Sequence, residues 1–150
     1  MNDEILKENL KLDEGGSSPS YEGELNLDGK KIGISVGIKI ERDENDIKDS
    51  FVFANKIWDW HKKNPLLVKQ LVANKMIEEA NKWLYGIGAE KITDDEFANK
   101  ISVKEFVTYP DQTVNFFFDD GGVFSYHTII ATFKIKSDGN FEIESAELFG

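Results

Sequence analysis

The sequence predicts an α+β fold: an antiparallel sheet of about six strands, with two long helices and one short helix inserted between strand 2 and strand 3. Three observations support this prediction. Apolar and polar residues alternate over 21–27 and 32–40, as in strands with one buried face. A helical period of apolar residues follows over 51–85, and four strand-like runs rich in Val, Ile, Phe and Thr close the chain. Strands and helices in separate blocks, without βαβ alternation, indicate α+β.

The chain begins with a polar stretch that ends in Gly, Ser and Pro residues. Ile5, Leu6 and Leu10 are spaced for one weak helical turn at most. We therefore expect residues 1–20 to form a flexible arm or a short helix. The rest, residues 21–150, has the length of a single α+β domain.

A hairpin is predicted where the two alternating runs meet. Asp28-Gly29 lies between them, and this dipeptide is a strong signal for a tight two-residue turn. The polar face of the second run carries the small residues Gly33, Ser35 and Gly37. Either another element packs closely there, which we favour, or that face is open.

Two long helices follow a polar connection over 41–50. The first begins at Phe51, where the apolar period changes from two to about 3.6. Asn64-Pro65 ends it, because the residue before a proline is disfavoured in the α region, and the same pair begins the second helix. That helix runs to about Tyr85, where two nearby glycines stop it.

The remaining elements are a short helix and four strands. Thr93 and Glu96 have the spacing of a capping box, so a helix is expected from there to about Lys100. Turn residues at 110–112 and 137–139 separate strands that form two hairpins. The predicted strands cover 101–109, 113–118, 127–136 and 140–148.

The composition excludes several classes of function. The net charge of −10 argues against nucleic-acid and anionic membrane surfaces as partners and suits a basic protein. The chain has no cysteine, which excludes disulfides and zinc–thiolate sites. No segment has the roughly 20 apolar residues of a membrane span, and the start does not resemble a secretory signal, so a cytoplasmic location follows by default. Nucleotide-binding glycine motifs are absent, and no cofactor is expected.

The best polar cluster for chemistry is Asp119, Asp120 and His127, which flank a Gly-Gly pair between two apolar runs. Two carboxylates and an imidazole could hold a divalent metal or perform acid–base catalysis, as in a metal-assisted hydrolase. The same residues also suit a turn whose carboxylates cap backbone amides. The turn is favoured, because a mononuclear metal site needs three or more protein ligands and only one histidine is present in the cluster.

Aromatic residues offer a second type of candidate site. Trp58, Trp83, Phe124 and Tyr126 are candidates for binding a small ligand between the helices and the sheet. Trp58 and Trp60 lie about 200° apart on a helix and cannot form one sandwich around a ligand, so Trp58 is better explained as core packing.

An aromatic strand at 116–118, an acidic glycine turn, His127 before an aliphatic strand and the turn Asp138-Gly139 follow one another in the last third of the chain. In this pattern the chain resembles the bacterial family called domain of unknown function 2262 and its relatives. The resemblance covers roughly residues 70–150 and includes an aromatic strand, an Asp-Gly turn, a histidine before an aliphatic strand, a second Asp-Gly turn and a closing glycine. The matching positions here are Phe116 to Asp120, Phe124, His127, Ile129-Ile130, Asp138-Gly139 and Gly150, with 83–86 and 92–97 upstream.

One position departs from that pattern, because Tyr126 stands where the family has a glycine before the histidine. The resemblance implies no established activity. It implies a small bacterial domain of the kind often suspected as a partner in toxin–immunity systems. Together with the charge, it predicts a non-enzymatic interaction module with a basic protein partner, and the hydrolase and the small-ligand binder remain as alternatives.

Overall fold

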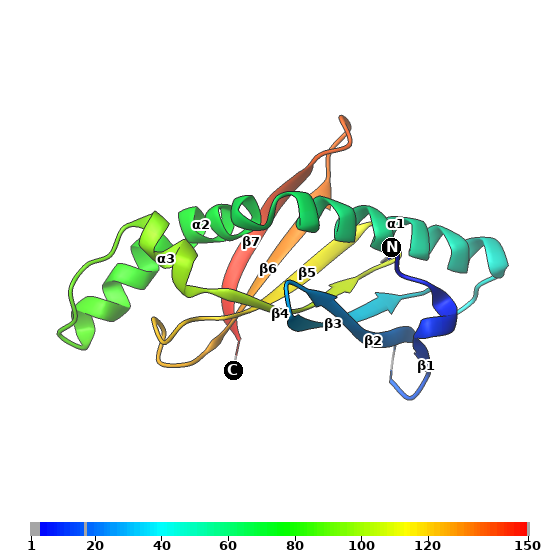
Figure 1. Ribbon diagram of the computed structural model, residues 1–150, viewed down its shortest axis with the longest axis horizontal. Coiled ribbons are helices and arrows are strands. Elements are labelled where there is room, and N and C mark those ends of the chain that lie inside the picture. Colours follow the sequence, from blue (N-terminus) through cyan, green and yellow to red (C-terminus); the bar gives the residue numbers. More distant parts are fainter. Residues whose placement is uncertain (1–3, 17, 150) are drawn as a thin grey trace.

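The computed structural model describes residues 4–16 and 18–149. The described chain contains a 3₁₀ turn, three α-helices and seven strands that form one sheet (Figure 1). The strands lie in chain order across the sheet, from β1 to β7. The elements are η1 (Lys7–Asn9), β1 (Lys11–Asp13), β2 (Ser20–Leu27), β3 (Lys30–Gly37), α1 (Glu44–Lys63), α2 (Pro65–Gly86), α3 (Asp94–Lys100), β4 (Ser102–Thr108), β5 (Thr113–Asp119), β6 (Thr128–Ile135) and β7 (Phe141–Phe149).

The α+β class is confirmed, but the sheet is mixed rather than antiparallel, which corrects the prediction. β3 and β4 pair in parallel, and all other neighbours are antiparallel. The three helices lie between these two strands, and the long crossover returns the chain to the end of the sheet where β3 began. Gly33 and Gly37 allow the close pairing, since a Cβ on Gly33 would lie 3.1 Å from the Cβ of Glu105.

The sheet also has seven strands instead of about six, because β1 pairs with the edge of β2. The stretch for which an arm or a short helix was expected thus contains η1 and a strand of only three residues. Such a short strand shows no alternation that a sequence pattern could reveal. Leu10 lies so close to Gly23 of β2 that a Cβ there would collide with its side chain. Because β1 precedes the two predicted strands β2 and β3, the helices follow the third strand of the chain and not the second.

The first long helix begins earlier than predicted, at Glu44 rather than at Phe51. A capping box explains the difference: the Asp43 side chain accepts from the amide of Asp46, and the Asp46 side chain accepts from the amide of Asp43. The first two turns are mostly polar and solvent-facing, so they lack the apolar period that marks the rest of the helix.

Other local predictions are confirmed. Asp28 and Gly29 both have positive φ, as a tight hairpin turn with two left-handed residues requires. Pro65 begins α2, and Thr93 and Glu96 form the expected capping box at α3. The four last strands fall within about two residues of the predicted ranges. None of the helices in the described chain is long and apolar enough to cross a membrane.

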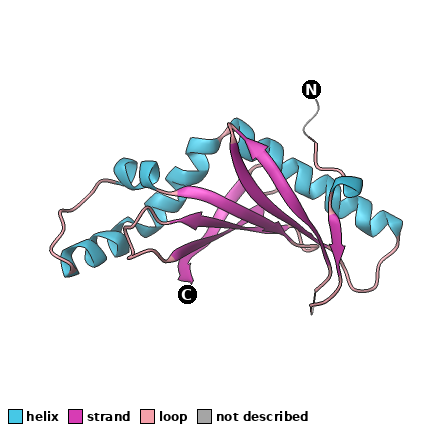
Figure 2. Cartoon of the chain, turned by 60° about the horizontal axis from the view of Figure 1, so that its bottom comes forward, coloured by secondary structure: helices cyan, strands magenta, loops and turns pink. Residues whose placement is uncertain are grey.

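The helices pack on one face of the sheet, and in Figure 2 the sheet lies in front of the helices. Phe106, Phe116 and Phe133 point to the helix side and form a run of ring contacts with each other and with residues of α1. Trp58 stacks on Phe106 with 6.0 Å between ring centroids. One layer of helices on one face of a sheet leaves the other face without a helical cover in the described chain.

Candidate functional site

The loop over residues 120–127, which we call the Asp120 loop, is organised by a buried carboxylate. Asp120 is fully buried. Its oxygens accept hydrogen bonds from the backbone amides of Gly122, Phe124 and His127 at 2.8, 2.9 and 3.0 Å. These three bonds fold the segment between β5 and β6 around one side chain. The arrangement gives Asp120 the role of a backbone cap.

The Asp120 loop also packs onto the end of α2. The ring of Trp83 meets Phe124 and His127 edge-on, with centroid distances of 5.6 and 5.3 Å. Phe124 is buried and also contacts Phe97 of α3. The His127 ring nitrogen Nδ1 is hydrogen-bonded to the carbonyl of Phe124. The structure thus brings three predicted candidates, Trp83, Phe124 and His127, into one packed cluster.

Four residues of this loop have positive φ: Gly121, Gly122, Ser125 and Tyr126. Gly121 is required for steric reasons as well, because a Cβ there would collide with the Lys100 carbonyl. Ser125 and Tyr126 are not glycine and adopt φ of 58° and 67°. Tyr126 is therefore at a position where the family pattern's glycine would fit the backbone better.

Asp119 is exposed and lies at the end of β5, where its carboxylate accepts from the amide of Gly121 at 3.3 Å. Both oxygens of Asp120 and the Nδ1 of His127 are likewise hydrogen-bonded to nearby backbone groups. Among the described residues, no three His, Cys, Asp or Glu side chains gather closely enough to hold a metal ion. The geometry of this cluster is that of a capped turn.

Trp58 lies in the core beside His61, one turn further along α1. His61 is 2% exposed, stacks on Trp58 and makes a tilted ring contact with Phe116. Its Nδ1 has no hydrogen-bond partner among the described atoms. Burial, with a smaller contribution from the charge of Lys69, lowers the pKa of His61 from 6.5 to about 4. The ring is therefore neutral at neutral pH and serves as a packing group.

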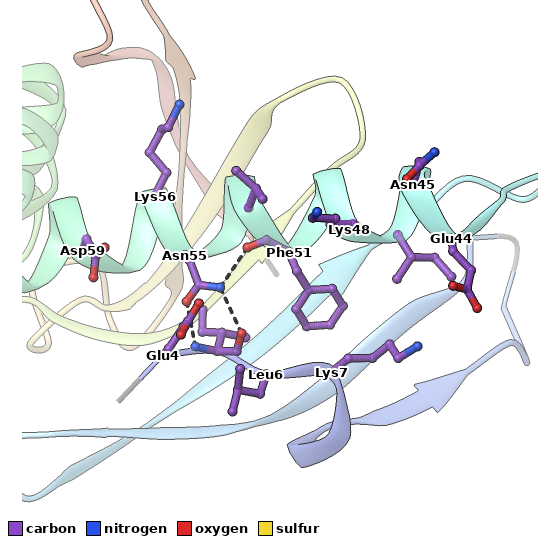
Figure 3. A pocket seen from close by; sticks show the side chains of 13 residues that line it. Glu4, Leu6, Lys7, Glu44, Asn45, Lys48, Phe51, Asn55, Lys56 and Asp59 are labelled. Carbon is purple, nitrogen blue, oxygen red and sulfur yellow. Dashed lines mark hydrogen bonds between the residues drawn. The ribbon is translucent and has the colours of Figure 1, made fainter. Parts of the chain in front are cut away.

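A groove of about 720 Å³ runs between α1 and the N-terminal segment (Figure 3). The Asn55 side chain spans its base by accepting from the amide of Ile5 at 2.7 Å and donating to the carbonyl of Ile5 at 2.9 Å. The same amide group also donates to the carbonyl of Phe51. Asn55 thus holds an extended segment to the helix, and Ile5 is buried beneath it. No sequence pattern marked this contact, because its partners are fifty residues apart.

Replacing Asn55 by alanine is expected to lower the free energy of unfolding by about 2 kcal/mol, because the polar backbone of Ile5 loses both partners. Urea unfolding measures this loss, and amide exchange at Ile5 reports its origin. The matched control is Asn45→Ala in the first turn of the same helix, where the side chain is exposed; it should change stability by less than about 0.5 kcal/mol. Equal effects of both variants would contradict the role of Asn55.

A second groove, of about 860 Å³, lies between the end of α2 and the segment that leads into α3. Ile77, Tyr85 and Ile92 contribute its apolar surface, and Asn81 fixes its wall by bonding both backbone groups of Ile92. Neither groove is lined by Trp58 or Trp83. Three of the aromatic residues proposed for ligand binding, Trp58, Trp83 and Phe124, thus contribute to packing, whereas Tyr126 is exposed and lines neither groove.

The face of the sheet turned away from the helices, which we call the open face, is a further candidate that the sequence patterns did not single out as a site. Strand register places Glu24, Gly33, Glu105, Phe117, Ile130 and Glu147 in one row across β2 to β7. Phe117 and Ile130 are half-buried at its centre. Acidic residues outnumber basic ones on this face: Glu22, Glu24, Glu105, Asp119, Glu142 and Glu147 against Lys11, Lys31 and Lys134.

The pattern of strand pairing explains why the open face has this character. Side chains alternate between the two faces, so every residue opposite a core position of β2 to β7 projects from the open face. Lys134 is held by Glu142 and Glu144 at 3.6 and 3.8 Å, which reduces the positive charge available there. Acidic side chains therefore dominate around a half-buried apolar centre.

Comparison with known protein families matches residues 3–148 to uncharacterised proteins conserved in bacteria, the family known as domain of unknown function 2262. Neither the curated proteins nor the solved structures compared with the chain gave a match. The match extends beyond residues 70–150, to which the sequence resemblance was confined, and includes the N-terminal segment, the first strands and α1. The chain thus belongs to the bacterial family domain of unknown function 2262.

Proposed function

We propose that this protein is a non-enzymatic interaction module that binds a basic protein through its open face. The observation that supports this proposal is the helix-free sheet surface with acidic residues around Phe117 and Ile130. A net charge of −10 adds a long-range field of the same sign. Such a field raises the rate of encounter with a basic partner and disfavours acidic ones.

The apolar centre supports the proposal in a different way. Affinity in protein interfaces comes largely from a few well-packed apolar or aromatic residues, surrounded by polar groups that exclude water. Phe117 and Ile130 are neighbours across β5 and β6, with Glu105 and Glu147 on either side. A partner that covers this row would bury the apolar pair and neutralise the two carboxylates. An immunity-like role, in which the basic partner is a toxin domain, is one form of this function.

A charge-reversal pair tests the open face. In Glu105→Lys/Glu147→Lys, binding of a labelled peptide of alternating arginine and alanine at low salt should weaken about tenfold, because both acids next to the apolar centre change sign. Fluorescence anisotropy measures the affinity, and amide shifts in the NMR spectrum should locate the peptide on β4 to β7.

The matched control is Glu78→Lys/Glu79→Lys, which makes the same change in net charge on the exposed side of α2. It should weaken binding by less than about twofold, since its charges lie on the other side of the sheet. If both pairs weaken the peptide equally, net charge alone explains binding, and the open face is not the site.

A further inference from the structure

We infer that Tyr126 is the anchor of this interaction module and that it receives an arginine side chain of the basic partner at one end of the open face. The inference depends on the proposed function and adds a residue and a partner chemistry to it. Tyr126 is 85% exposed, so its ring contributes little to the core. It also has a φ of 67°, a conformation that disfavours residues other than glycine. A turn that served folding alone would gain from glycine here.

The loop holds Tyr126 in a fixed position. Phe124, two positions before it, and His127, directly after it, both donate their backbone amides to the buried Asp120 carboxylate. The ring itself lies over Gly122, where an added Cβ would be 3.5 Å from the Tyr126 Cζ and Oη atoms. A tyrosine fixed in this way loses little conformational entropy when a partner binds, which is the property of an anchor residue.

The end of the sheet from which the Asp120 loop extends carries groups that fit a cation. Asp119, Thr128 and Phe149 pair across β5, β6 and β7 at the end of the sheet where the loop lies. Phe149 is 61% exposed, and Asp119 presents its carboxylate to solvent. Two exposed aromatic residues with a carboxylate at the same end of the sheet match a planar guanidinium, which stacks on a ring while pairing with a carboxylate. Lysine offers a point charge without the planar surface, so arginine is the better fit.

Two variants of Tyr126 and two probe peptides test the inference. Tyr126→Gly should raise the thermal midpoint, because it removes the backbone strain, and should weaken the arginine–alanine peptide about fivefold. Tyr126→Phe should keep the affinity within about twofold, since the aromatic face is retained. A lysine–alanine peptide should lose less affinity than the arginine peptide on Tyr126→Gly. Because Tyr126→Gly is expected to be more stable than the wild type, weaker binding by this variant is not explained by unfolding.

The outcomes separate the anchor from the function that it serves. If Tyr126→Gly binds the arginine peptide as the wild type does, while Glu105→Lys/Glu147→Lys binds it weakly, the open face is the binding surface. Tyr126 is then not its anchor residue. If neither variant weakens the peptide, both the anchor and the open face are wrong. An equal loss for arginine and lysine peptides would overturn the assignment of arginine as the matching side chain.

Discussion

Replacing Asp120 by alanine is expected to lower the free energy of unfolding by about 4 kcal/mol, the largest effect of any single change considered for this protein. Its carboxylate is fully buried and accepts from the backbone amides of Gly122, Phe124 and His127. Alanine leaves these donors without an acceptor, and an unsatisfied buried amide costs about 1–3 kcal/mol. Since small domains are stable by only about 5–15 kcal/mol, the loss is a large part of the total.

Urea unfolding followed by tryptophan fluorescence measures this effect, because Trp83 packs directly on the loop. Asp119→Asn is the matched control: it changes the adjacent, exposed carboxylate and should cost less than about 0.5 kcal/mol. Hydrogen exchange at the amides of Phe124 and His127 should accelerate in Asp120→Ala alone. A loss of stability in Asp120→Ala no greater than that in the control would show that the carboxylate does not organise the loop.

Acidification is expected to destabilise the wild type through His61, by about 3 kcal/mol between pH 6.5 and pH 4. The pKa of His61 is about 4 in the folded state, against an ordinary value of 6.5. Between these values the unfolded chain binds a proton at His61 that the folded chain does not, so stability falls as the pH falls. Above pH 6.5 both states are neutral at this residue, and below pH 4 both are protonated, so the contribution is then constant.

His61→Met removes the titrating group and retains a side chain that adapts to the ring contacts with Trp58 and Phe116. The carboxylates titrate in both proteins, so their effect cancels in the difference between the two. Unfolding free energies measured from pH 7 to pH 4 should diverge, with the wild type losing more. Parallel pH profiles for the two proteins would contradict the burial of a neutral histidine at this position.

The candidate site shows which structural features can be predicted from residue patterns and which cannot. The turn with two glycines was predicted over 119–126, between two strands, and the structure has it over 120–127, because its signals are local in the sequence. The pattern left open whether Asp120 and His127 serve chemistry or the turn. Only the folded loop shows that both oxygens of Asp120 are used by amides up to seven residues away. A pattern of residue types contains no information on which donors a buried carboxylate will meet.

The sequence by itself determined the α+β class, the Asp28-Gly29 hairpin, the helix break at Pro65 and the capping box at Thr93, because each depends on neighbours a few residues apart. The tertiary structure alone decided the parallel pairing of β3 with β4, the addition of β1 and the face that the helices cover. These features depend on contacts between distant segments, where many pairings are compatible with the same periodicity. The open face follows from that choice, since helices that cover one side of the sheet leave the acidic side without a helical cover in the described chain.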